Sequence, residues 1–232
     1  GLLDLELELS GNGDRIISDG EIRLRQVDLQ LDALRQAPLS NAQLDVDHDV
    51  LYDLSSQRLV IDYGRLALND IPLYLDGSVS LAGSKELDLN LRLNELNIAK
   101  AVEGLPAGLV NNVLPLRPGG LVTARLHLAG TTENPAAWPQ DGELRFDGLE
   151  VSAGGLRPAL TGLISLKGDM LLADDLSLVV GGNRLHLEGE ARSIHRRPIV
   201  AIANVSSERM VIDELLPKEA SPSDTQGPGE GE

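Results

Sequence analysis

The residues best suited to acid–base or metal chemistry in this chain are its histidines, and their spacing favours neither role. His127 and His186 stand between strand leucines, and they align with Glu8 and Tyr74 in the other half of the chain. A catalytic or metal-binding position would not accept such different residue types, so both histidines are interpreted as solvent-facing. His48 shares the apolar parity of its strand and is expected to cap the end of that face. The four histidines are His48, His127, His186 and His195.

Other chemical motifs are equally sparse. Asp45, Asp47 and Asp49 resemble part of a calcium loop, but strand alternation explains them and the glycine that such a loop needs is missing. The chain has no cysteine, so it lacks a thiolate nucleophile and a cysteine-based zinc site. It also contains no Gly-x-Ser-x-Gly elbow and no glycine-rich phosphate loop. We therefore expect a protein that is not an enzyme and that has no cofactor and no metal.

Charge narrows the choice of partners. The formal net charge is −16, with 36 acidic residues against 20 basic ones, which opposes binding to nucleic acid. Arg192, His195, Arg196 and Arg197 form the one basic cluster. We interpret it as a loop that offsets local acidity, with contact to a lipid head group or a partner as the alternative.

The elements that carry these residues are β-strands. Gly1–Ser10 alternates apolar and acidic residues strictly, and Leu87–Leu93 has leucine at every odd position. Period-two alternation indicates half-buried strands, and about twelve such segments follow one another through short turns. The sequence therefore predicts a mainly all-β fold with antiparallel meandering strands. Short helical pieces are expected only within Ile98–Val113 and at Val211–Leu216.

Two strands change phase in the middle. The apolar parity flips at Arg25-Gln26 and again at Asp147-Gly148. A single inserted residue has this effect, so both sites are predicted to be β-bulges at bends where the strand exchanges faces.

The chain uses one stretch twice. Leu59–Pro106 resembles Leu171–Pro217, and the segments upstream of each copy match more loosely. Such spacing is too long for common helical solenoids and fits a duplicated sheet unit. We predict a first β-unit over residues 1–117, a second over 118–217, and a disordered tail or linker over 218–232. The matching positions are Leu59, Asp62, Leu66, Leu73, Leu75 and Gly77 with Leu171, Asp174, Leu178, Leu185, Leu187 and Gly189.

Composition fits either an uncovered aliphatic surface or a leucine-rich core with ordinary packing, and the scarcity of helices favours the uncovered surface. Hydrophobic residues make up 42% of the chain but aromatic residues only 2%, and few helices are available to cover a long sheet. A long, curved and twisted antiparallel sheet with an apolar concave groove is the expected solution. An exposed apolar surface of that size normally marks an interaction site. The predicted groove residues are Leu66, Leu73, Leu75, Leu89, Leu91, Leu93, Leu126, Leu128, Leu178, Leu185 and Leu187.

The order of motifs resembles a known family. Gly120–Gly130, followed by Asn134-Pro135 and Gly142–Phe146, is similar to segments of the AsmA/TamB superfamily, and so is Arg184–Gly189 leading to Pro217. The resemblance implies an envelope protein of the periplasm, anchored in the inner membrane by a segment absent from this chain. It further implies a groove that shields lipid chains between the two membranes, in support of outer-membrane biogenesis.

The expected partners follow from that resemblance and from the pattern. They are a phospholipid or other acyl-chain lipid, further sheet of the same full-length protein, and an envelope protein, but no nucleic acid. The alternative is a non-enzymatic structural or interaction scaffold of the cell envelope that uses its edge strands. In either case we expect the Gly1–Ser10 and Ile199–Ser206 strands to pair with further sheet on at least one side.

Overall fold

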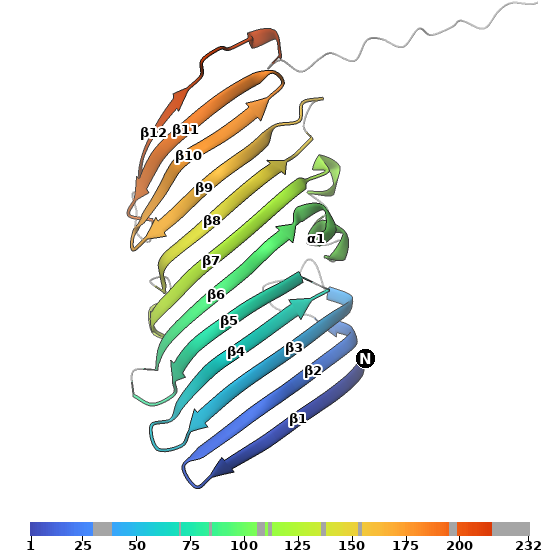
Figure 1. Cartoon of the computed structure of the whole chain (residues 1–232), viewed down its shortest axis with the longest axis vertical. Coiled ribbons are helices and arrows are strands. Elements are labelled where there is room, and N and C mark those ends of the chain that lie inside the picture. Colours follow the sequence, from blue (N-terminus) through green and yellow to red (C-terminus); the bar gives the residue numbers. More distant parts are fainter. Residues whose placement is uncertain are drawn as a thin grey trace, which may run out of the picture.

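The fold is one open antiparallel sheet. A computed structural model describes residues 1–29, 39–69, 71–83, 85–105, 110, 113–135, 138–152, 155–194 and 199–214. The sheet has 12 strands, and each strand pairs with the next one in the sequence, from β1 to β12. Figure 1 shows this order as a twisted ladder that is not closed into a barrel. The predicted all-β class and the antiparallel meander are confirmed.

Each half of the sheet contains six strands, with small helical segments after β6 and after β12. The strands are β1 (Leu2–Asn12), β2 (Arg15–Leu29), β3 (Leu39–Asp53), β4 (Arg58–Leu68), β5 (Ile71–Ser80), β6 (Glu86–Asn97), β7 (Gly119–Thr131), β8 (Pro139–Glu150), β9 (Ala159–Lys167), β10 (Met170–Val180), β11 (Asn183–Arg192) and β12 (Val200–Ser206). The helical segments are α1 (Ile98–Gly104) and the 3-10 turns η2 (Leu114–Leu116) and η4 (Ile212–Glu214).

Side chains at the turns end the strands. Between β1 and β2, the Asn12 side chain accepts hydrogen bonds from the backbone N–H groups of Asp14 and Arg15, at 3.1 Å each. Between β3 and β4, Asp53 accepts from the hydroxyl of Ser55 at 2.6 Å and from the backbone N–H of Ser56 at 2.9 Å. These hydrogen bonds, the one from the Ser55 side chain first, lower the pKa of Asp53 well below its usual range.

Both predicted β-bulges are confirmed. The pairing of β2 with β3 shifts between Leu24 and Val27, and the pairing of β8 with β9 shifts between Phe146 and Leu149. Gln26 and Gly148 have positive φ angles of 54° and 60° at these points. The extra residue reverses the parity of the strand, so the apolar side chains beyond the bulge stay on the same face as those before it.

Two further bulges fall at positions that the sequence repeat relates. The pairing of β4 with β5 shifts between Ile61 and Gly64, and that of β10 with β11 shifts between Ala173 and Leu176. These two sites are related by the offset that relates Leu59 to Leu171. The units meet within one sheet, because β6 pairs with β7 across the predicted boundary.

A cap segment follows the last strand of each unit. Asn97 begins α1, where its side chain accepts a hydrogen bond from the Lys100 N–H at 3.0 Å. The Asn69 side-chain amide then donates to the Gly104 carbonyl at 2.6 Å and so ties the end of α1 to the turn after β4. In the second unit, Asn183 holds the backbone of Val211 in the same manner.

The expected helical pieces are confirmed in part. Within Ile98–Val113, α1 matches the first piece, and most of the second lies outside the described residues. At Val211–Leu216, η4 is the helical turn, while Leu215 and Leu216 lie outside the described residues. The predicted tail over 218–232 also lies outside them.

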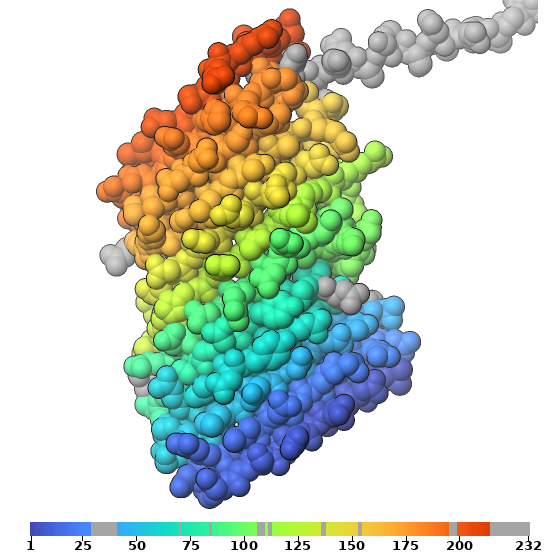
Figure 2. Space-filling view, viewed as in Figure 1, coloured from blue at the N-terminus to red at the C-terminus, as the bar shows by residue number. Residues whose placement is uncertain are grey.

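No second layer covers the sheet among the described residues. Only seven hydrophobic residues there are buried, and three of them belong to α1 or lie just beyond it. Figure 2 shows one face of the molecule, on which the colour bands of successive strands follow one another from β1 to β12. Most apolar side chains are therefore packed only by their neighbours on the same face. The buried hydrophobic residues are Ala42, Ala67, Leu87, Ala101, Val102, Val110 and Leu176.

Candidate functional site

The strand register sorts the side chains onto two faces of opposite character. We call the side that carries Leu3, Leu5, Leu7 and Leu9 of β1 the apolar face, and the other side the polar face. Residues paired across neighbouring strands share a face, so the faces can be followed through the ladder from β1 to β12. Every predicted groove leucine, from Leu66 in β4 to Leu187 in β11, lies on the apolar face.

Exposure differs between the two faces. In β6, Leu89, Leu91 and Leu93 are half-buried, whereas the polar-face residues between them, Asn90 and Arg92, are exposed. The same alternation runs through β8. Since no layer covers the apolar face of the described strands, lateral packing between neighbouring leucines accounts for this partial burial.

The two outermost strands lack even this lateral packing on one side. All residues of β1 and β12 are exposed, and the exposed fraction reaches 66% at Leu9 and 60% at Ile202. Among the described residues, each of these strands has one edge without a partner strand. Unpaired backbone and exposed apolar side chains therefore coincide at both edges.

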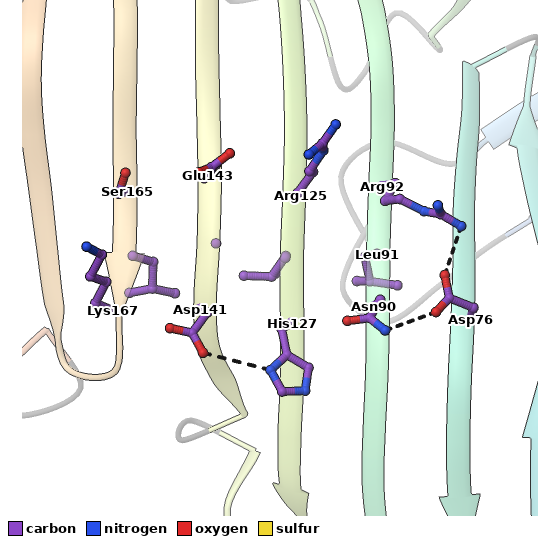
Figure 3. A pocket seen from close by; sticks show the side chains of 13 residues that line it. Asp76, Asn90, Leu91, Arg92, Arg125, His127, Asp141, Glu143, Ser165 and Lys167 are labelled. Atoms are coloured by element: carbon purple, nitrogen blue, oxygen red, sulfur yellow. Dashed lines mark hydrogen bonds and ion pairs between the residues drawn. The ribbon is translucent and has the colours of Figure 1, made fainter.

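Two hollows among the described residues lie over the polar face. One of about 560 Å³, which we call the junction hollow, spans β5 to β9 across the boundary between the units (Figure 3). An apolar concave groove was predicted from the sequence. The apolar face is present and open, but its concave shape stays a prediction. The polar-face residues that line the junction hollow are Asp76, Asn90, Arg92, Arg125, His127, Asp141, Glu143, Ser165 and Lys167.

Ion pairs and hydrogen bonds link neighbouring strands across the junction hollow. The Arg92 guanidinium lies 2.8 Å from one carboxylate oxygen of Asp76, and the other oxygen accepts a hydrogen bond from the Asn90 amide at 2.9 Å. His127 has its Nε2 atom 2.8 Å from Asp88 and its Nδ1 atom 3.9 Å from Asp141 (Figure 3 shows the Asp141 contact). These groups are solvated, so their contacts add little to stability, and the lining of the hollow carries charges of both signs.

A second hollow of about 400 Å³, the acidic hollow, lies over the polar face of β1 to β3. Its acidic residues face solvent on neighbouring strands, and Gly20 forms part of its floor. Among the described residues, no group of three or more histidine, aspartate or glutamate side chains is arranged to hold a metal ion. The carboxylates that line the acidic hollow are Glu6, Glu8, Asp19, Glu21 and Asp47.

The structure corrects the interpretation of His48. Its side chain does not cap the end of the apolar face, because His48 lies well inside β3 and pairs with Gly20 on one side and Gly64 on the other. Its Nε2 atom is 2.9 Å from the hydroxyl of Ser18, and its Nδ1 atom is buried without a hydrogen-bond partner among the described residues. Two glycines opposite an apolar-parity histidine are the sequence signal that could have revealed this setting.

The remaining candidates are solvated. His186 lies on the polar face of β11, near Arg184 and Arg209. Arg192 of the predicted basic cluster pairs with Glu190 at 2.8 Å, whereas His195, Arg196 and Arg197 lie outside the described residues.

Comparisons with known proteins add no relative. No protein-family model, no curated protein and no solved structure matches the chain. Within the described part of the chain, no helix has the length and apolar character needed to cross a membrane.

Proposed function

We propose that this chain is a lipid-handling section of an envelope protein, and that its apolar sheet face shields acyl chains as they pass between membranes. One observation carries the proposal: the apolar face continues through all 12 strands, and no second layer covers it among the described residues. Exposed apolar surface of this extent requires an occupant in water, and an extended hydrocarbon chain matches a long aliphatic strip. The near absence of aromatic residues suits that occupant, since leucine side chains form a smooth surface.

The proposal places the protein in the periplasm, attached to the inner membrane through a segment outside this chain, as the resemblance to the AsmA/TamB superfamily implies. It assigns no reaction, cofactor or metal to the chain. Phospholipid or another acyl-chain lipid is the cargo, and the leucines from Leu66 to Leu187 form the contact surface.

Native mass spectrometry of the protein purified from bacteria tests the proposal. Wild-type protein should carry phospholipid. Replacing Leu75 and Leu187 together by aspartate should remove it, because both substitutions put a charge on the apolar face. Stability should fall by less than two buried core charges would cause, since the face can admit water.

A matched control makes the same two substitutions on the polar face instead of the apolar face. Leu163 and Leu172 lie on the polar face, where Leu163 pairs with Asp174 and Leu172 pairs with Ser165. Replacing both by aspartate should leave the bound lipid in place. Protein without lipid in the wild type, or equal loss of lipid from both double variants, would contradict the proposal. Failure of the Leu75/Leu187 variant to fold would identify these leucines as ordinary core residues.

The two exposed edges favour a second candidate, an interaction scaffold built by strand addition. β12 has no charged residue on either face, so it lacks the charges that usually protect an edge. A strand equivalent to β1 or β7, from further sheet of the same protein or from an envelope protein, is the partner that this edge fits. Replacing Ile202 by lysine should then reduce concentration-dependent association in light scattering without changing lipid content.

A further inference from the structure

A short polar stripe interrupts the apolar face on β2 and β3. Ser18 pairs with Val50, and His48 and Tyr52 lie two residues to either side of Val50 on the same strand and the same face. The stripe is therefore His48, Ser18 and Tyr52, with the serine between the other two. All three side chains are partly accessible. Two glycines flank His48, whereas aliphatic residues flank Ser18 and Tyr52 on the same face.

Hydrogen bonding indicates what the stripe offers to a ligand. Neutral imidazole has one N–H, and in His48 only Nε2 has a partner, the Ser18 hydroxyl. A buried N–H without an acceptor is less favourable than a buried nitrogen acceptor without a donor, so we assign the proton to Nε2. Nε2–H then donates to the Ser18 oxygen, and the Ser18 hydroxyl proton remains available. The Tyr52 hydroxyl makes no hydrogen bond with the described residues and is a second donor.

Packing does not require this polarity. In the second unit, Leu166 pairs with Gly142 just as His48 pairs with Gly20 in the first. A leucine therefore fits beside a glycine on one side, although its other neighbour is Leu171 where His48 has Gly64. The first unit instead holds an imidazole with one buried nitrogen unsatisfied, an arrangement that costs stability.

We propose that Ser18 and Tyr52 bind the ester carbonyl oxygens of a glycerophospholipid, with His48 as a positioning residue that orients the Ser18 hydroxyl. The inference rests on the proposed function, because it fixes where the glycerol region of the cargo lies on the apolar face. Two neutral donors match two acceptor oxygens at the point where acyl chains begin. A free carboxylate fits less well, because Asp19, Asp47 and Asp49 occupy the opposite face of the same strands.

An ester–ether pair of lipids tests this assignment by titration calorimetry. Dihexanoyl phosphatidylcholine has both ester carbonyls, and its dihexyl ether analogue has neither. Wild-type protein should bind the diester roughly 10-fold more tightly, as expected for two hydrogen bonds to neutral acceptors. The double variant Ser18→Ala/Tyr52→Phe should bind both lipids alike. The control Ser165→Ala/Tyr63→Phe removes the same two hydroxyls from the polar face and should keep the wild-type preference.

His48→Leu provides an independent test. It should halve the logarithm of the affinity ratio between the diester and the ether lipid, because Tyr52 remains as one of the two donors. It also keeps the inference testable should the double variant fail to fold. Equal wild-type affinity for the two lipids would overturn the inference and leave the proposed function standing. Binding of neither lipid by the wild type would overturn both. Hexanoate could also compete with the diester for the protein. If it competes equally well, the site binds a carboxyl group and not an ester, and the assignment is overturned.

Discussion

On the polar face, the first unit carries Glu6 and Glu8 of β1 where the second unit carries Arg125 and His127 of β7. Both pairs flank an apolar-face leucine that lies beside a glycine of the next strand. The backbone plan is thus shared, and the charges differ. The acidic hollow lies within the first unit, and the mixed junction hollow lies where the two units meet.

This difference shows how little the fold asks of the polar face. A strand needs alternation, turns and bulges at the right places, and any solvated side chain serves at the polar positions. The apolar face is more restricted, since both units place aliphatic residues at most of its positions. Exceptions on that face, such as Ser18 and His48, therefore need a separate explanation.

The largest expected effect tests the shared backbone plan at Gly77, which has a φ of 133° and whose added Cβ would overlap the Asp88 carbonyl oxygen. Gly77→Ala should cost about 3 kcal/mol or more in free energy of unfolding, because a central strand cannot move away. The equivalent Gly189→Ala should cost about 1 kcal/mol. Its Cβ would lie 2.7 Å from the Ile202 oxygen, but β12 is an edge strand that can shift. Urea unfolding measures both costs, and equal costs would contradict the expected difference between central and edge positions.

The next prediction compares the two asparagines that hold the cap segments. Asn183 is 1% exposed and bonds both the N–H and the carbonyl of Val211, while Asn69 is more accessible. Asn183→Ala should cost about 2 kcal/mol in free energy of unfolding, and Asn69→Ala about 1 kcal/mol. Asn204→Ala, on exposed β12, is the neutral control. A larger loss at Asn69 would show that α1, not the segment around η4, is the critical cap.

Exchanging the residues at the equivalent positions His48 and Leu166 sharpens the comparison between the apolar faces of the two units. His48→Leu should leave the free energy of unfolding unchanged or raise it by up to about 1 kcal/mol, because it removes an unsatisfied buried nitrogen. Leu166→His should lower it by about 1–2 kcal/mol, since the second unit offers no serine at the place of Ser18. Should His48→Leu destabilise the sheet as much as Leu166→His, the imidazole would be a structural requirement.

The smallest effect concerns the turn after β3. Asp53 closes this turn of the first unit. Hydrogen bonds, first of all the one from the Ser55 side chain, lower its pKa. The ionised form is favoured by folding, so its contribution is present above the unfolded pKa of about 4 and is lost as pH falls through the lower folded value. Asp53→Asn should lower the urea midpoint slightly at pH 7, and this difference should shrink progressively as the pH falls below about 4. A pH-independent difference would assign the effect to turn geometry alone.

The sequence determined the strands, their antiparallel order and both phase-flip bulges, because alternation and turn residues act locally. The offset between Leu59 and Leu171 likewise predicted a repeat that reappears as matching bulges at Ile61 and Ala173. Same-face placement of the leucines followed from the parity of each strand.

Only the tertiary structure decided which side chains meet across strands. The register put Ser18 beside His48, which are 30 residues apart in the chain, and paired His127 with Asp88 across the boundary between the units. Parity assigns a residue to a face but not to a neighbour. The neighbour depends on turn lengths and bulges accumulated along several strands, where one extra residue changes every later pairing.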